Sequence, residues 1–102
     1  MIRVHIKSKF INEGGVVGRS RYADGSPALL FSPDSGEPAY ALSTNLAGHN
    51  ITVPAEGHVY IKGYAEHEGL CEALVKLGVV EAVQEITLGP YDTKATLVKV
   101  LV

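Results

Sequence analysis

Apolar and polar side chains alternate along the first eleven residues of the chain. Most even positions are apolar and most odd positions are basic, in the order Ile2, Arg3, Val4, His5, Ile6, Lys7, Ser8, Lys9, Phe10 and Ile11. A period of two residues is typical of a strand with one buried face, because successive side chains point to opposite faces. The pattern therefore predicts a first strand with its even positions in the core.

A second extended segment follows a group of turn-forming residues. Asn12–Gly15 favours a turn, and residues 16–22 resume an extended pattern. If Arg19 and Arg21 face solvent together with the basic residues of the first strand, odd positions pair with odd positions, because directly opposed residues share a face. That register requires an odd-numbered loop. The sequence predicts Glu13-Gly14-Gly15 as this loop.

Turn signals divide the rest of the chain into further strands. Asp24-Gly25 and the segment 33–38 enclose the apolar run 28–31, which predicts a central strand. Additional strands are expected at 40–46, 58–64 and 95–102, with an irregular connection at 47–57 and a turn at 89–92. Residues 79–88 fit either a strand or a loop with a short strand.

The hydrophobic period changes to that of a helix over residues 66–77. One stripe at this period holds Leu70, Ala73, Leu74 and Leu77, and the other side holds Glu68, Glu72 and Lys76. Acidic residues near the start, a lysine near the end and Gly78 directly after the stripe match the preferences of helix termini. The sequence predicts this one helix.

Length and composition fit one soluble domain. The chain has 102 residues, of which 46% are apolar and 20% are charged, which is close to the globular average. No uncharged apolar run reaches the ~20 residues that span a bilayer, and the charged N-terminal segment does not resemble a signal peptide. We expect a single α+β domain over residues 1–102, in the cytoplasm and without a membrane segment. Its antiparallel, meander-like sheet carries one amphipathic helix on one face.

The net charge of −2 conceals an asymmetry between two parts of the chain. Residues 1–26 hold five basic and two acidic side chains, which gives +3, and residues 27–102 hold four basic and nine acidic side chains, which gives −5. Two interpretations follow. Either the two parts attract each other within the folded protein, or the basic surface is reserved for an external partner.

The sequence lacks residue patterns typical of catalysis or of a cofactor site. The single cysteine, Cys71, excludes an intramolecular disulfide and a thiolate metal cluster, and its place in the helical segment predicts burial. The four histidines show neither HxH nor HExxH spacing, and the run Gly14–Arg19 does not fit the phosphate-loop pattern. We therefore expect a non-enzymatic protein without a metal or cofactor.

Two predicted strand faces carry groups that suit single-stranded nucleic acid. One is the basic face of the opening hairpin, and the other is a strand face on which aromatic and basic residues alternate. The contact residues of this alternative function are Arg3, Lys7, Lys9, Arg19, Arg21, Tyr60 and Tyr64. Such binding would weaken steeply with added salt.

A group of short motifs between residues 36 and 80 is similar to a known family. The motifs are Gly36-Glu37-Pro38, Leu42-Ser43, Asn45-Leu46, the run from Tyr60 to Val75 with Tyr64-x-Glu66-x-Glu68-Gly69 at its centre, and Gly78-Val79-Val80. They resemble an uncharacterised bacterial family of small proteins from conjugative plasmids, integrative elements and phages. Family members tend to have serine at position 65, which with Glu68 would complete a capping box, whereas this chain has Ala65. The family's tyrosine directly follows the proline, whereas Ala39 precedes Tyr40 here, which moves the ring to the opposite strand face.

The resemblance implies an accessory protein of a bacterial mobile element and no established activity or cofactor. We expect it to act by contact with an unidentified protein partner, and this context suggests inhibition of a host defence such as restriction or CRISPR. Tyr64, Glu66 and Glu68 are the expected contact residues, and in the alternative interpretation they cap and anchor the helix. A homodimer formed through an exposed edge strand is a further alternative.

Overall fold

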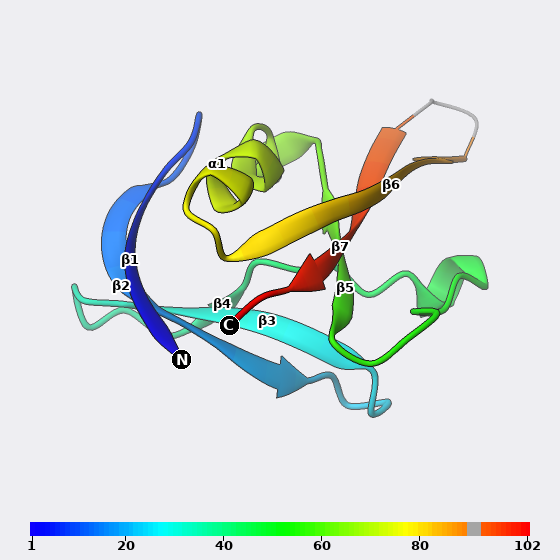
Figure 1. Ribbon diagram of the computed structural model, residues 1–102, viewed down its shortest axis with the longest axis horizontal. Coiled ribbons are helices and arrows are strands. Elements are labelled where there is room, and N and C mark those ends of the chain that lie inside the picture. Colours follow the sequence, from blue (N-terminus) through cyan, green and yellow to red (C-terminus); the bar gives the residue numbers. More distant parts are fainter. Residues whose placement is uncertain (90–92) are drawn as a thin grey trace.

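The protein folds as two antiparallel sheets and one helix (Figure 1). The computed structural model describes residues 1–89 and 93–102, apart from the side chain of Glu66. The first sheet has the strand order β1-β2-β3-β4 and the second the order β5-β7-β6. The elements are β1 (Ile2–Lys7), β2 (Asn12–Arg21), β3 (Pro27–Pro33), β4 (Tyr40–Ala41), β5 (His58–Lys62), α1 (Leu70–Lys76), β6 (Val80–Leu88) and β7 (Thr93–Val100), with short 3-10 turns at Ala47–His49 and Ala65–His67. The α+β class predicted from the sequence is confirmed.

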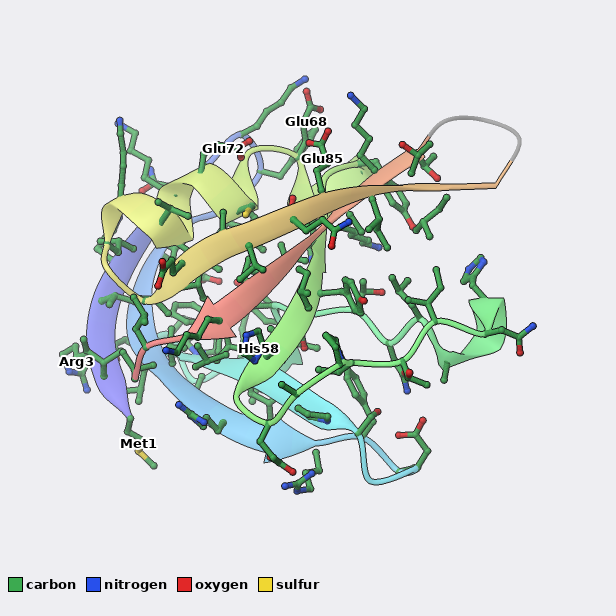
Figure 2. All side chains as sticks on the ribbon, turned by 45° about the vertical axis from the view of Figure 1, so that its right-hand side comes forward. Met1, Arg3, His58, Glu68, Glu72 and Glu85 are labelled. Carbon is green, nitrogen blue, oxygen red and sulfur yellow. The ribbon has the colours of Figure 1, made fainter. Side chains whose placement is uncertain are left out.

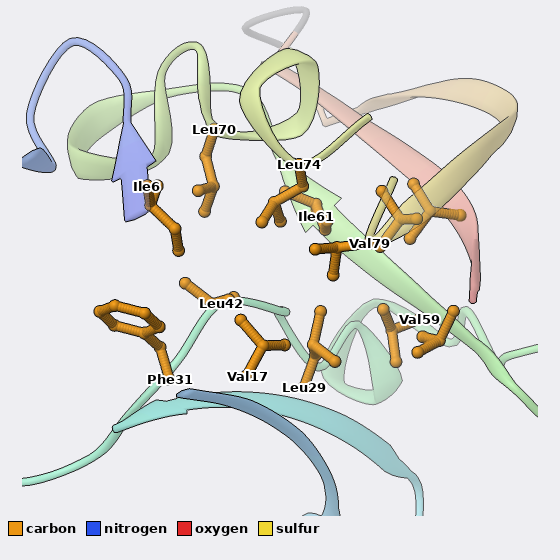
Figure 3. Close-up of a cluster of buried hydrophobic side chains, with 13 residues drawn as sticks. Ile6, Val17, Leu29, Phe31, Leu42, Val59, Ile61, Leu70, Leu74 and Val79 are labelled. Carbon is orange, nitrogen blue, oxygen red and sulfur yellow. The ribbon is translucent and has the colours of Figure 1, made fainter. Parts of the chain in front are cut away.

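The main core lies between the two sheets and α1 (Figure 3). Leu70 and Leu74 point from α1 into this core, as the helical stripe predicts, and both are fully buried. The facing residues include Val17 from β2, Leu29 and Phe31 from β3, Val59 and Ile61 from β5, and Val98 and Val100 from β7. Each fully buried aliphatic or aromatic side chain of this kind stabilises the fold by roughly 1.5–3 kcal/mol.

A second apolar cluster covers the other face of the β5-β7-β6 sheet. It contains Leu46, Tyr60, Leu88, Ala95 and Leu97, with half-buried Ile51 and Val53 from the irregular connection. The backbone N–H of Thr44 donates a hydrogen bond of 2.8 Å to the carbonyl oxygen of Tyr60, which joins the end of the first sheet to β5. Three successive residues of β5, positions 59–61, are buried because both faces of this strand are covered.

The first hairpin forms as predicted, but the predicted loop and register are wrong. Its loop is Ser8–Ile11, closed by a 2.7 Å hydrogen bond from the Ser8 N–H to the Ile11 carbonyl oxygen. Odd positions of β1 consequently pair with even positions of β2. Gly15 lies within β2, where a Cβ atom would come 2.4 Å from the Ser32 carbonyl oxygen and 2.7 Å from Cζ of Phe31. This glycine is required for close packing between strands and not for a turn.

The helix is shorter than its apolar stripe suggests. It begins at Leu70 because Gly69 has a φ of +79° and interrupts the helical backbone after the 3-10 turn Ala65–His67. Its N-cap is Gly69, which has no side chain to cap the helix, so position 65 is not at the N-terminus of α1 and the capping box expected there does not apply to this helix. Gly78, with a φ of +73°, ends the helix as predicted.

The remaining predictions differ in how closely they match the structure. The apolar run 28–31 forms β3, an interior strand, and residues 58–64 and 95–102 contain β5 and β7. The predicted strand 40–46 shortens to Tyr40–Ala41, and residues 79–88 contain β6, with an irregularity between Ala82 and Gln84. Most of the predicted turn 89–92 lies outside the described residues. Among the described residues, no helix is long and apolar enough to cross a membrane.

Candidate functional site

The basic residues of the first two strands point to different sides of the sheet. The register puts Arg19 on the core-facing side of β2 with Val17. Arg19 Nε donates a 2.7 Å hydrogen bond to the carbonyl oxygen of Val102, and Nη2 donates one of 3.1 Å to that of Val100. Arg3 and Lys7 lie on the opposite face of the sheet. The single basic face predicted from the sequence is therefore not formed.

Three basic side chains of the N-terminal segment pair with acidic residues from the rest of the chain. Arg3 pairs with Asp34, Lys9 with Glu68 at 3.0 Å, and Arg21 with Glu56 at 3.4 Å. All six side chains are at least half exposed, so each pair contributes only about 0–1 kcal/mol. Attraction between the two oppositely charged parts of the chain is thus confirmed at these three positions.

The two tyrosines proposed to stack on bases are not displayed together. Tyr60 is 6% exposed within the second apolar cluster, and its hydroxyl donates a 3.3 Å hydrogen bond to the Thr52 carbonyl oxygen. Tyr64 is half-buried, and Lys62 Nζ lies 5.3 Å from the centre of its ring. A base cannot stack on Tyr60 unless the segment that covers it moves away.

The expected contact residues lie where the chain enters α1. Tyr64 precedes the 3-10 turn, and Glu68 follows it and pairs with Lys9 from the first hairpin loop. The side chain of Glu66 lies outside the described part of the structure. The Lys9–Glu68 pair links the hairpin loop to the start of the helix, which supports the interpretation that this segment anchors α1.

A pocket of about 590 Å³ lies beneath the first hairpin loop. It is lined by Phe10, Ile11, Asn12, Glu13, Tyr40, Ala41 and His67. The Tyr40 hydroxyl donates a 2.7 Å hydrogen bond to Glu13 Oε1. Burial and the adjacent Glu13 carboxylate raise the pKa of Tyr40, so its hydroxyl keeps its proton and the bond to Glu13. The arrangement makes Tyr40 a fixed donor and a poor proton acceptor.

Cys71 and the metal-ligating residue types give no reactive centre among the described residues. Burial raises the pKa of the Cys71 thiol, which disfavours the thiolate needed for nucleophilic chemistry. No group of three His, Cys, Asp or Glu residues in the described part of the chain is arranged to hold a metal ion.

β6 has a free edge, which sequence reasoning did not single out. β6 hydrogen-bonds only to β7, and residues 81–85 are all exposed. Val83, at the irregularity in the strand, is 54% exposed. A row of unpaired backbone N–H and C=O groups is a template for another strand. The sequence feature that could have pointed to this edge is the loss of apolar–polar alternation over residues 81–85.

An open groove runs beside this edge, between β6 and α1. Its volume is about 500 Å³, and its lining combines apolar side chains with charged ones, among them Glu72 and Glu85, which Figure 2 labels. The residues are Cys71, Glu72, Val75, Lys76, Ala82, Val83, Gln84, Glu85 and Thr96. Val75 is 42% exposed, so α1 and β6 each present a valine to solvent at this groove.

Other sheet edges carry the features that discourage strand addition. β1 presents Arg3, His5 and Lys7, and β4 is only two residues long. β5 is bridged by Thr44. β6 contains neither lysine nor proline and spans nine residues, although it has an irregularity near its middle. Among the described strands, it is the longest free edge.

Comparison with known proteins identifies no relatives. The chain matches no protein-family model, and neither a curated protein nor a solved structure shows significant similarity to it.

Proposed function

We propose that this chain is a non-enzymatic protein that acts by protein–protein contact and that its contact surface is the β6 edge with the adjoining α1 groove. The observation that carries the proposal is the nine-residue free edge beside a groove with two exposed valines. Exposed apolar side chains next to unpaired backbone groups suit recognition by strand addition. The motifs of residues 36–80 add the context of a bacterial mobile element, with a host-defence protein as the target.

The internal ion pairs favour a protein partner over a nucleic acid. Arg3, Lys9 and Arg21 already have acidic partners, and Arg19 is held by carbonyl oxygens at the end of β7. Lys7 forms no ion pair with a described residue, so it is the basic side chain best suited to test phosphate binding.

Photo-crosslinking tests where the protein makes contact. A benzoyl-phenylalanine at position 83 is expected to form covalent adducts with a protein from a bacterial host. The same group at Ser32, which is exposed on β3, serves as the matched control. Adducts of equal yield from both positions would contradict a specific surface at β6.

A functional assay tests the proposed role against host defence. Expression of the protein in a restriction-proficient strain is expected to raise the efficiency of transformation by unmodified plasmid, and Val83→Glu is expected to abolish the gain. In parallel, fluorescence anisotropy with single-stranded DNA and RNA is expected to show no binding at low salt. Tight binding that is salt-sensitive and lost in Lys7→Glu would overturn the proposal in favour of nucleic-acid recognition.

A further inference from the structure

We propose that the pocket beneath the first hairpin loop binds a small organic cation, in which an ammonium group is joined to a short apolar body. The pocket has a volume of about 590 Å³, which lies within the range of small-molecule sites. Its described lining residues all differ from those of the groove beside β6. The inference therefore goes beyond the proposed function and stands or falls independently of it.

The pocket contains a carboxylate whose charge no described side chain balances. Glu13 of β2 lies directly opposite the fully buried Ile6 of β1, so it shares the core-facing side of the sheet and is itself half-buried. Glu13 forms no ion pair with a described residue. A half-buried carboxylate has lost part of its hydration, and a cation that binds beside it compensates for that loss.

The hydrogen bond between Tyr40 and Glu13 determines which groups are left for a ligand. The Tyr40 hydroxyl donates its proton to Glu13 Oε1 at 2.7 Å. The Tyr40 ring is held by an edge-to-face contact with Phe31, a core residue that Figure 3 labels. No described residue donates to Glu13 Oε2, so this oxygen and the hydroxyl oxygen of Tyr40 remain as acceptors. A ligand at this point has to donate hydrogen bonds, and an ammonium group carries three donors.

The remaining walls of the pocket suit the apolar part of such a ligand. Phe10 lines the pocket and is 58% exposed, although its neighbour Ile11 is half-buried. An aromatic ring also attracts a cation through its negative face. Lys9 Nζ lies 5.5 Å from the centre of the Phe10 ring, but Lys9 pairs with Glu68 at 3.0 Å and does not neutralise the carboxylate of the pocket.

Other classes of ligand fit the pocket less well. An anion would be repelled by the Glu13 carboxylate and would find acceptors where it needs donors. A neutral apolar molecule would cover the carboxylate without compensating its charge, which is unfavourable. No group of three metal-ligating side chains lies in the described part of the chain, so a metal ion lacks a ligand set there. The pocket therefore favours a cation with an apolar body.

Titration with phenethylammonium chloride, followed by proton–nitrogen NMR, tests the inference. The amide signals of residues 10–13, 40–41 and 67 are expected to shift, with a Kd of about 1 mM or lower. 2-Phenylethanol has a similar body without the charge and is expected to bind about tenfold more weakly, because it loses a hydrogen bond between charged groups. 3-Phenylpropionate, with the opposite charge, is expected not to bind.

Three variants locate the binding site. Glu13→Gln removes the charge at nearly constant shape and is expected to raise the Kd about tenfold. Glu81→Gln removes the same charge from an exposed position of β6 outside the pocket and is expected to leave the Kd unchanged. Phe10→Ala truncates an exposed side chain, so the fold is retained, and is expected to raise the Kd about two- to fivefold. The amide spectrum of each variant verifies that it is folded.

Each outcome decides the inference. Tighter binding of the ammonium than of the alcohol, weakened in Glu13→Gln and Phe10→Ala but not in Glu81→Gln, would support it. Absence of shifts at the pocket residues at about 10 mM probe, where a site with a Kd of about 1 mM is mostly occupied, would overturn it. Equal binding of the ammonium and the alcohol, or an unchanged Kd in Glu13→Gln, would overturn it as well. Crosslinking from position 83 tests the proposed function separately.

Discussion

Gly15 of β2 packs against the ring of Phe31 on β3 at a distance that admits no side chain. A Cβ atom at position 15 would lie 2.7 Å from Cζ of Phe31. Phe31 is fully buried in the main core and makes an edge-to-face contact with Tyr40, with ring centres 5.6 Å apart. The absence of a side chain at position 15 therefore lets the aromatic ring lie directly beneath β2.

Gly15→Ala is expected to lower the free energy of unfolding by about 1–3 kcal/mol, because either Phe31 or the β2 backbone must shift. Urea denaturation measures the change. Gly18→Ala is the matched control in the same strand, since its Cβ would meet only Met1 Cγ at 3.5 Å. Equal destabilisation by both variants would contradict the packing explanation.

Gly78→Ala is expected to destabilise the protein by about 1 kcal/mol through backbone strain alone. Gly78 has a φ of +73°, and a Cβ there would meet no atom within 4 Å. Gly48 also has open space around it but lacks a positive φ, so Gly48→Ala is the control without the strain. Thermal unfolding of the two variants separates strain from steric effects, and a Gly78→Ala protein as stable as wild type would argue against a strained left-handed position.

Arg19→Met is expected to free the end of β7. The variant keeps much of the aliphatic side chain but removes two hydrogen bonds to the carbonyl oxygens of Val100 and Val102. We expect a loss of about 1–2 kcal/mol and faster hydrogen exchange in residues 98–102. Arg21→Met removes an exposed ion pair with Glu56 and an exposed 2.8 Å hydrogen bond to the Gly25 carbonyl oxygen within its own turn, and should change stability by less than about 1 kcal/mol. Unchanged exchange at the end of β7 in Arg19→Met would show that these bonds do not hold it.

The Asp24 carboxyl group is expected to titrate well below its usual range. Hydrogen bonds from Ser26 and, at 3.1 Å, from the Asn45 amide lower the pKa of Asp24 to about 2. Because the folded-state pKa lies below the unfolded value of 3.8, the group stabilises the fold fully above pH 3.8, and this contribution is lost as the pH falls toward 2. Carbon NMR titration of the carboxyl group measures the pKa directly. Ser26→Ala is expected to raise it toward 3.8, and an unchanged pKa in that variant would refute the hydrogen-bond explanation.

The sequence predicted the elements whose side chains follow a regular period. Alternation over residues 2–11 identified β1, although the strand ends at Lys7. The helical stripe correctly located Leu70 and Leu74 in the core but not Leu77, which follows the helix and is 38% exposed. The predicted hairpin loop was wrong because glycine is common both in turns and where two strands pack closely. The two cases differ only in which residue lies opposite the glycine in the folded protein. Gly15 could be assigned only once Phe31 was placed beneath it.

The candidate surface was harder to predict than the fold. The alternation of Tyr60 with Val59 and Ile61 predicts that its side chain is exposed. In the structure, the irregular connection that contains Ile51 and Val53 covers it. At β6 the irregularity near Val83 breaks the alternation that would have identified the strand. Exposure of an edge depends on strand order, and local sequence does not encode that order.

The position of β7 sets the order in which the chain can fold during synthesis. Strands β1 to β4 lie within residues 2–41 and pair with their neighbours in sequence, so the first sheet can assemble as soon as it leaves the ribosome. β5 and β6 each pair with β7, which occupies the centre of the second sheet. Until residues 93–100 emerge, β5 and β6 have no strand to pair with along the edges that face β7. The strand order therefore makes completion of the second sheet depend on the last strand of the chain.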